Sequence, residues 1–324
     1  MSGVQKKRVT DDEDGMRLDR WFRSHFPRVR HGALEKYLRK GEVRVDGGRA
    51  KSNRRLQSGE EIRIPPLPNN AEKKSAKSSF RPEDRAAIES MIVYEDDAII
   101  ALNKPFGLAT QGGAKTTRHL DGLLSSYISE AGKPRLVHRL DKDTGGLIIV
   151  AKSRPDAQRL ADAFQSHDVE KTYWALVAGG PRPRQGTISM PIEKQLSQDK
   201  ETPFERVEPV KQGGKDAVTD YQILDEAGVT AFVAFRPITG RTHQIRVHAA
   251  AIHHPIIGDR KYGGEEAFID GVAPRLHLFC RSMSFRHPRT GRRMTLEAPL
   301  TEHMRETWNF FAFDAEADCE WPDR

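Results

Sequence analysis

The first sixty residues show two helical stripes of apolar residues followed by two short alternating segments. The stripes predict helices over 18–26, which Pro27 ends, and over 31–40. Apolar and polar residues then alternate at 43–45 and 62–64 beside glycine turns, as in short strands. The two stripes consist of Leu18, Trp21, Phe22 and Phe26, and of Leu34, Tyr37 and Leu38.

Further along the chain, apolar runs typical of strands dominate and helical stripes interrupt them. The stripes predict helices over 156–166 and 242–253, each with its apolar residues on one face. Because strands come in runs with scattered helices, the pattern predicts an α+β fold rather than a parallel sheet of alternating strands and helices. The predicted strands lie at 98–102, 147–151, 172–178, 217–224 and 229–235.

A polar segment separates the two regions and suggests their boundaries. It begins with Pro65, Pro66 and Pro68 and continues in Lys, Ser and Ala with almost no large apolar residue. This composition predicts a linker over 65–88, between a small module at 14–64 and a larger domain at 89–312. The acidic residues at 313–324 are expected to form a solvated tail.

The positive charge of the chain is concentrated in the small module. The 324 residues include 53 Lys and Arg against 46 Asp and Glu, a formal net charge of +7. Residues 14–64 alone contain fourteen basic and seven acidic residues. Their net charge, +7, equals that of the whole chain. A basic module of this size predicts a polyanionic partner such as a nucleic acid.

Composition excludes several other classes of protein. The mean hydropathy is −0.67, and no apolar run approaches the roughly 18 residues that a spanning helix needs. The charged start of the chain lacks the apolar segment of a signal peptide. The two cysteines, Cys280 and Cys319, are far apart and suggest neither a disulfide framework nor a zinc site. We therefore expect a soluble, cytoplasmic protein without membrane contact.

The densest group of ionisable residues is His138-Arg139-Leu140-Asp141-Lys142-Asp143, directly before Gly145-Gly146 and a predicted strand. Nearby positive charge favours the ionised form of an aspartate, which suits a nucleophile or a base better than an acid. A solvated turn with local ion pairs would have the same composition, so both interpretations stay open at this point.

A second candidate is the segment from Arg236 to His248, where a predicted strand turns at Gly240 into a helix. Thr242 can cap that helix, and Arg241 and Arg246 could hold phosphate or carboxylate groups with the helix amides. An amphipathic helix with a polar outer face is the alternative.

Metal and nucleotide sites find little support in the sequence. His243, His248, His253, His254 and Asp259 are suitable metal ligands, but residues i and i+5 of a helix lie roughly 140° apart. No HExxH motif is present, so no metal is expected. The phosphate-binding glycine patterns of nucleotide cofactors are absent as well.

Together these motifs resemble those of the pseudouridine synthases that modify large-subunit ribosomal RNA and some transfer RNAs. Residues 138–147 resemble the family signature, and the module at 14–64 resembles the RNA-binding domain named after small-subunit ribosomal protein S-four. Thr110-Gln111 stands where relatives often have Val-His. The further matching segments are Asn103-Lys104-Pro105, Lys171-Thr172-Tyr173, Gly240 to His248, and Gly258-Asp259 with Tyr262-Gly263.

The resemblance implies a catalytic domain with a mixed, mainly antiparallel sheet, and a reaction that needs no cofactor. It marks Asp141 as the catalytic residue, acting on the ribose as a nucleophile or as a proton acceptor. Arg246 would pair with Asp141 and keep it ionised. Tyr173 would stack on the flipped base and take the proton from the carbon that becomes bonded.

The RNA contacts follow from the same resemblance. Arg139 would fill the gap that the flipped base leaves, while Lys104 and Arg241 are candidates for phosphate contacts. In the basic module, the expected RNA contacts are Arg39, Lys40 and Arg44.

The resemblance thus implies an isomerase that modifies specific uridines of 23S ribosomal RNA, or of a large-subunit precursor. Segments 38–45 and 63–66 most resemble the branch of the family that acts on the large subunit. We expect a monomer, since no protein partner is indicated. Three alternatives remain: a related synthase for other ribosomal or transfer RNA uridines, a non-catalytic RNA-binding or ribosome assembly factor, and a metal-dependent RNA hydrolase.

Overall fold

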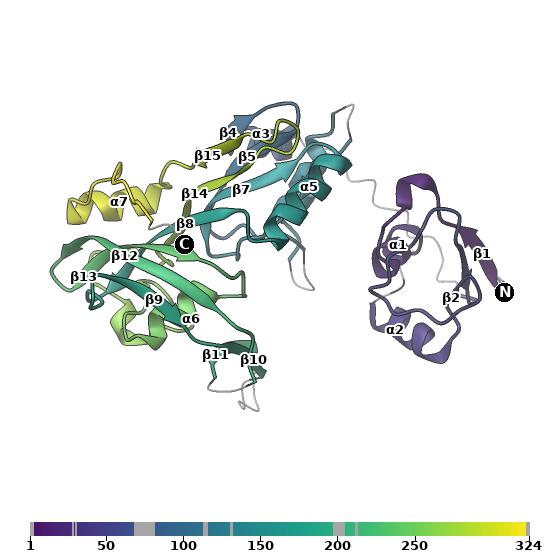
Figure 1. The fold of residues 1–324 in the computed structure, drawn as a ribbon, viewed down its shortest axis with the longest axis horizontal. Coiled ribbons are helices and arrows are strands. Elements are labelled where there is room, and N and C mark those ends of the chain that lie inside the picture. The colour runs from purple at the N-terminus through teal and green to yellow at the C-terminus, as the bar shows by residue number, and fades with distance from the viewer. Residues whose placement is uncertain are drawn as a thin grey trace. The chain divides into compact units, whose positions relative to one another are not determined.

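The chain folds into two units, Met1–Lys77 and Ser78–Arg324, each built around its own core (Figure 1). The structure is a computed structural model. It describes residues 3–27, 29, 31–67, 82–112, 116–129, 132–196, 205–210 and 213–321. Within these ranges, no helix combines the length and the apolar character that crossing a membrane would require.

The N-terminal unit packs two helices against a three-stranded antiparallel sheet of order β1-β3-β2. Trp21, Leu34 and Ile62 are almost fully buried in its core, so the predicted helices and the two predicted strands are confirmed. Strand β1 was not predicted, because its sequence QKKR is polar and fully exposed. The elements are β1 (Gln5–Arg8), η1 (Asp11–Glu13), α1 (Leu18–His25), α2 (His31–Lys40), β2 (Arg44–Val45) and β3 (Glu61–Ile64).

The C-terminal unit contains a ten-stranded sheet with the order β4-β5-β7-β14-β8-β13-β12-β9, to which β15 adds beside β14 and β6 beside β7. Strands β7 and β14 are parallel, and the other recorded pairs are antiparallel. This confirms the α+β fold with a mixed, mainly antiparallel sheet. Its strands are β4 (Ile92–Glu95), β5 (Ile99–Lys104), β6 (Arg135–Leu136), β7 (Gly145–Ala151), β8 (Glu170–Ala178), β9 (Gln185–Ser189), β12 (Val218–Ala227), β13 (Thr230–Pro237), β14 (Leu278–Arg286) and β15 (Arg293–Glu297).

Helices and one hairpin complete this unit. Strands β10 (Ile192–Leu196) and β11 (Glu205–Pro209) form a separate antiparallel pair. The two predicted helices are present as α5 and α6, one at each end of the sheet in Figure 1. The helical elements are α3 (Pro82–Glu89), α4 (Leu120–Leu123), η2 (Leu124–Ser126), α5 (Arg154–Gln165), α6 (Gln244–Ala251), η3 (Glu265–Ala267) and α7 (Glu302–Phe311).

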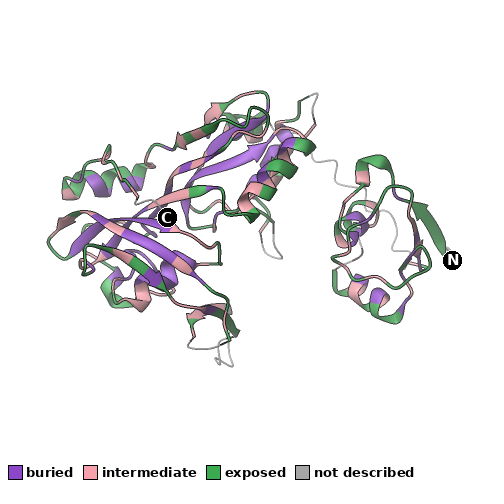
Figure 2. Cartoon of the chain, viewed as in Figure 1, coloured by how far each residue is buried: buried purple, intermediate pink, exposed green. Residues whose placement is uncertain are grey.

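The centre of the sheet is buried on both faces, as the purple strands of Figure 2 show. Alternate residues of β13 belong to two different apolar clusters. Phe232 packs into a cluster that includes Trp308 of α7, and Val233 packs into a cluster that includes Ile245 of α6. Burial on both faces explains why these strands read as continuous apolar runs in the sequence.

Strand β14, which lies between β7 and β8, was not predicted from the sequence. Leu278, Phe279 and Cys280 are buried in succession, and the pairing register with β8 then shifts between Cys280 and Ser282. Such a bulge interrupts the alternation of apolar and polar residues by which a strand is recognised. The sequence pattern therefore hid the strand that joins the two halves of the sheet.

Gly146 allows β7 to approach β14 closely next to the site. Gly146 has φ +104°, and a Cβ there would lie 2.3 Å from the carbonyl oxygen of Cys280. Cys280 in turn pairs with Tyr173 of β8. Gly146, Cys280 and Tyr173 thus form a row across three strands, which places the loop before β7 close to Tyr173.

The interval 65–88 differs from the predicted linker at its C-terminal end. Residues 82–88 lie in α3, whose Ile88 is fully buried and whose Asp84 pairs with Arg118 at 3.4 Å. This helix packs against α4 and η2, so it is part of the C-terminal unit. Residues 68–81 of the predicted linker lie outside the described residues.

The segment after α7 is not the solvated tail that its acidic composition suggested. Phe313 is buried, and the indole Nε1 of Trp321 donates a hydrogen bond to Thr172 Oγ1 at 3.0 Å. The guanidinium of Arg236 lies 4.9 Å from the centre of the Trp321 ring. Aromatic residues between the acidic ones thus fix residues 313–321 on the sheet, while 322–324 lie outside the described residues.

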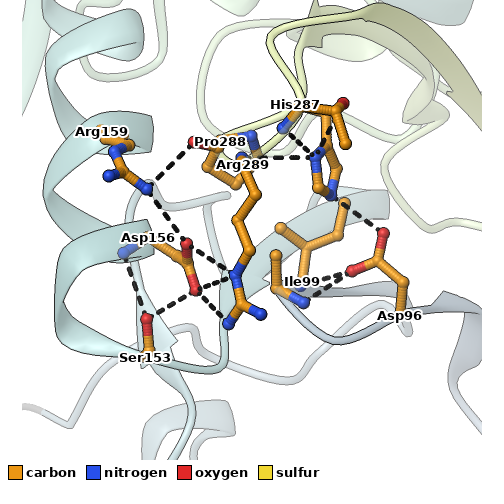
Figure 3. Close-up of polar contacts among 10 residues, drawn as sticks. Asp96, Ile99, Ser153, Asp156, Arg159, His287, Pro288 and Arg289 are labelled. Carbon is orange, nitrogen blue, oxygen red and sulfur yellow. Dashed lines mark hydrogen bonds and ion pairs between the residues drawn. The ribbon is translucent and has the colours of Figure 1, made fainter.

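A polar cluster fastens the turn between β14 and β15 to the start of α5 (Figure 3). The carboxylate of Asp156, which is almost fully buried, accepts hydrogen bonds from Ser153 and from the Arg289 guanidinium. The hydrogen bonds from Arg289 lower the Asp156 pKa despite its burial. On the same turn, His287 Nε2 lies 3.0 Å from Asp96. This ion-pair cluster is structural, because none of these residues lines the pocket described below.

Candidate active site

The loop that carries Asp141 is fixed by Thr110. The Thr110 hydroxyl donates to the carbonyl of Leu140 at 2.6 Å and accepts from the backbone N–H of Leu140 at 3.2 Å. Both Thr110 and Leu140 are buried. Thr110, which stands where relatives often have Val, therefore anchors the residue next to Asp141. The neighbouring Gln111, which stands in the place of the His, is exposed.

Lys104, predicted to contact phosphate, is instead completely buried. Its Nζ donates hydrogen bonds to the backbone carbonyls of Pro105 at 3.1 Å and Leu108 at 2.9 Å, and it lies 3.4 Å from the carbonyl of Lys142. Burial lowers the Lys104 pKa to about 8, even though Asp143 and Asp141 act in the opposite direction. The prediction of a phosphate contact is corrected, because this ammonium group ties the loop at 105–108 to the loop of Asp141.

Tyr173 of β8 lies in the row with Cys280 and Gly146. It lines the same pocket as Asp141. Cys280 of β14 is its partner in the sheet. Burial raises the Tyr173 pKa well above its ordinary value, and Cys280 and Asp141 act in the same direction. The side chain is therefore a neutral phenol at physiological pH.

Arg246 of α6 does not make the expected pair with Asp141. Its guanidinium forms a two-pronged pair with the buried Asp259, with Nε–Oδ2 at 2.8 Å and Nη2–Oδ1 at 2.7 Å. Burial lowers the Arg246 pKa, but the hydrogen bonds and charge of Asp259 outweigh this effect and the net shift is upward. Asp141 contributes to that upward shift through space. Arg246 thus belongs to the site without a direct hydrogen bond to Asp141.

His243 is the site residue that the sequence analysis missed, having considered it only as a metal ligand. Its Nε2 lies 3.8 Å from Asp141 Oδ2, and its Nδ1 is 2.7 Å from the hydroxyl of Tyr262. His243, with φ +56°, is the N-cap residue of α6. The prediction that Thr242 caps this helix is therefore wrong. Burial lowers the His243 pKa, against the attraction of Asp141. Only the tertiary contact with Asp141 reveals this role.

A pocket of about 290 Å³ is lined by Asp141, Tyr173, His243 and Arg246. This volume lies at the lower end of the roughly 300–1,000 Å³ that small-molecule pockets occupy. Arg139 and Arg241, both exposed, extend from its rim. The pocket brings together five of the six predicted site residues of the larger domain, with Lys104 as the exception. The predicted residues that line it are Arg139, Asp141, Tyr173, Arg241 and Arg246.

His138, the first residue of the signature, lines the pocket and also supports the loop. Its Nε2 accepts a hydrogen bond from the backbone N–H of Ile149 at 2.9 Å, and its ring stacks on Phe164 with 4.3 Å between centres. Burial and the charge of Lys171 lower the His138 pKa to about 3. The ring is neutral and links the loop to β7 and α5.

The histidines that could have formed a metal site have separate partners. His248 is hydrogen-bonded to Thr219 Oγ1 and Met190 O, while His254 Nδ1 bonds the carbonyl of Ala178. In the part of the chain that the structure describes, no group of three or more metal-ligating side chains occurs. These contacts give the metal-dependent hydrolase no support.

In the N-terminal unit, the predicted RNA contacts Arg39, Lys40 and Arg44 are all exposed. Arg39 lines a shallow hollow together with Arg49 and Lys51. Arg44 donates hydrogen bonds to the carbonyls of Gly41 and Gly47, so its guanidinium also stabilises the turn around it.

The chain is similar in sequence to known proteins along nearly its whole length. A family model described as RNA pseudouridylate synthase matches residues 98–251. The ribosomal large subunit pseudouridine synthase C of Escherichia coli K12 is 36% identical over 302 residues, which cover 92% of this chain and 93% of that protein. The chain belongs to the RNA pseudouridylate synthase family. Its match to synthase C of Pasteurella multocida is 34% identical and covers 94% of this chain and 92% of that protein.

Solved structures of the family have the same fold. Human RNA pseudouridylate synthase domain containing 4 aligns with a TM-score of 0.58 at 24% identity, over 71% of this synthase and 97% of that chain. Human RNA pseudouridylate synthase domain containing 1 aligns with a TM-score of 0.53 at 25% identity, over 64% and 82% of the two chains.

Proposed function

We propose that this synthase converts specific uridines of 23S ribosomal RNA, or of a large-subunit precursor, into pseudouridine. The observation that carries the proposal is the pocket in which Asp141, Tyr173 and Arg246 meet. The substrate class rests on the relatives named ribosomal large subunit pseudouridine synthase C, which this chain matches along nearly its whole length.

The reaction requires the target base to leave its stack. An enzyme cannot reach a glycosidic bond inside a helix, and unstacking one nucleotide costs a few kcal/mol. A pocket of about 290 Å³ suits a single flipped nucleotide. The exposed Arg139 at the rim has a planar guanidinium that can stack in the gap left in the RNA.

Asp141 is proposed as the group that acts on the ribose, as a nucleophile or as a proton acceptor. The bond between C1′ and N1 breaks, the uracil turns, and a bond between C1′ and C5 forms while the C5 proton is lost and N1 gains one. The product has the same atoms as the substrate, so the reaction requires no cofactor.

The other residues position the reactants. Tyr173, which lines the pocket together with Asp141, is assigned to stacking on the base and to taking the proton from C5. Arg246 supplies positive charge near Asp141 while Asp259 holds its guanidinium in place. His243, held by Tyr262, forms the wall next to Asp141.

We infer that the synthase works as a monomer, since a single chain supplies every residue of the proposed site. A cytoplasmic location follows from the proposed substrate, ribosomal RNA. Size-exclusion chromatography with light scattering tests the monomer. A mass near 36.6 kDa supports it, and twice that mass contradicts it.

The test of function is a map of pseudouridines in the RNA of cells that lack the gene. The proposal expects specific sites in 23S ribosomal RNA to revert to uridine, and to return when the wild-type chain is supplied but not when Asp141→Asn is supplied. Loss of sites only in transfer RNA or in other ribosomal RNA would identify the related synthase instead. An unchanged map with defective ribosome assembly would indicate a non-catalytic factor.

A further inference from the structure

A second hollow, of about 710 Å³, adjoins the active-site pocket. His243 and Arg246 line both spaces. Asp143, two residues after the proposed catalytic Asp141, also lines the second hollow. Anything that extends from a nucleotide in the pocket past these residues therefore enters the second hollow.

The second hollow is strongly basic. Arg260, Lys261 and Arg275 line it in addition to Arg246, and Asp143 is the one acidic residue among its lining residues. Arg260 and Arg275 are exposed, and no ion pair joins either guanidinium to a carboxylate of the described ranges. We call the surface formed by Arg260, Lys261 and Arg275 the basic hollow.

The basic hollow is built from a turn that Asp259 holds in shape. Asp259 Oδ1 accepts hydrogen bonds from the backbone N–H groups of Lys261 at 2.9 Å and Tyr262 at 3.1 Å. The same carboxylate receives the Arg246 guanidinium from α6. The turn that carries Arg260 and Lys261 is thus connected directly to a residue of the active-site pocket.

Gly258 brings the two arms of the basic hollow together. Its φ is +78°, and a Cβ at this position would lie only 1.8 Å from the carbonyl oxygen of Arg275. The glycine lets the backbone before Arg260 pass directly against the backbone of Arg275. This contact, rather than chance exposure, places the two arginines on one surface.

We propose that the basic hollow binds the phosphodiester backbone of the RNA strand on one side of the flipped uridine. This inference rests on the proposed function, because it takes the nucleotide in the pocket as its starting point. Guanidinium groups bind phosphate through paired, charge-assisted hydrogen bonds. Such contacts carry no base identity, so the hollow would add affinity for the strand without selecting its sequence.

The test compares Arg260→Gln, Arg275→Gln and the double variant in the full-length chain, with a 23S ribosomal RNA transcript as the probe. Arg305→Gln, an exposed arginine on α7 outside both spaces, is the matched control. Each lost phosphate contact should reduce the slope of log affinity against log salt by about 0.7–0.9. We expect a higher KM and an unchanged single-turnover rate at saturating RNA, while the control matches the wild type.

Two results would overturn the inference. One is an unchanged salt slope and KM in the double variant. The other is a large fall in the saturated single-turnover rate, which would place the arginines in the chemistry instead of in strand binding. Failure of the proposed function would look different, since the wild-type enzyme would then form no pseudouridine in the transcript whatever the variants do to binding.

Discussion

Two ionisable residues of the sequence motifs, Lys104 and His138, support the structure of the site through hydrogen bonds to the backbone. Lys104 and His138 both lie in segments that resemble the family pattern; the resemblance made Lys104 a candidate for a phosphate contact, and His138 belongs to the densest group of ionisable residues. Lys104 instead donates to backbone carbonyls, and His138 accepts from a backbone N–H. Motif membership identified residues around the site, but only burial and hydrogen bonding separate the supports from the reacting groups.

For Lys104, the variant Lys104→Met should lower the single-turnover rate of pseudouridine formation and leave RNA affinity nearly unchanged. Methionine fills a similar space but cannot bond the carbonyls of Leu108 and Lys142, so the loop of Asp141 loses part of its support. Filter binding at several salt concentrations, together with single-turnover assays, checks this. A shallower salt slope with an intact rate would restore the role as a phosphate contact.

For His138, we predict a loss of stability in acid. Its pKa is about 3 in the folded chain and about 6.5 when unfolded. Above pH 6.5 both states are neutral and the full stability is present. Below it the unfolded chain gains a proton that the folded chain does not, so stability falls by up to about 1.4 kcal/mol per pH unit toward pH 3. Urea unfolding from pH 7.5 to 4.5 should show a weaker dependence in His138→Gln, and equal slopes would contradict the assignment.

At the scale of elements, the site depends on a row of residues across β7, β14 and β8. Gly146, Cys280 and Tyr173 pair in that row. The sequence predicted β7 and β8, whose apolar runs are continuous, but missed β14 because of its bulge. It also missed the pair of Arg246 with Asp259, since residues thirteen positions apart meet only through the turn after α6.

The helix α3 and the segment after α7 show the same limit of sequence patterns. Each is polar or acidic on average, and each is fixed by a few apolar residues, such as Ile88 and Trp321. Average composition predicted a linker and a tail, whereas the individual apolar contacts determine the structure.

The row of strands makes a specific prediction for Gly146. Gly146→Ala should destabilise the C-terminal unit strongly, because its Cβ would collide with the backbone of Cys280. The control is Gly132→Ala, at φ +95° but with no atom within 4 Å of the added Cβ; this change should cost only the roughly 1–2 kcal/mol of a left-handed backbone. Urea unfolding measures both, and equal losses in the two variants would show that the close approach is unimportant.

In the whole molecule, positive charge is distributed unevenly along the chain. The module at 14–64 contains the net positive charge of the chain, and it belongs to a unit with its own core. We propose that this unit binds RNA and thereby raises the local concentration of the catalytic unit near its substrate.

Deleting residues 1–77 should therefore weaken binding to 23S ribosomal RNA and reduce its salt dependence, by about 0.7–0.9 of slope per lost phosphate contact. The single-turnover rate at saturating RNA should change little, because the pocket residues all lie in the C-terminal unit. Circular dichroism controls for folding. An unchanged salt slope would show that the N-terminal unit does not bind the RNA. A large fall of the single-turnover rate in a folded protein would place this unit in the active site.

In the proposed reaction, Asp141 performs the chemistry on a uridine held in the pocket. Tritium release from 23S ribosomal RNA labelled at C5 of uridine, measured for the wild type and Asp141→Asn, tests it most directly. We expect the variant to lose at least about a hundred-fold in rate, the lower end of what a positioned acid or base contributes, and to bind the RNA as the wild type does. Release at a rate close to that of the wild type would contradict the assignment of Asp141.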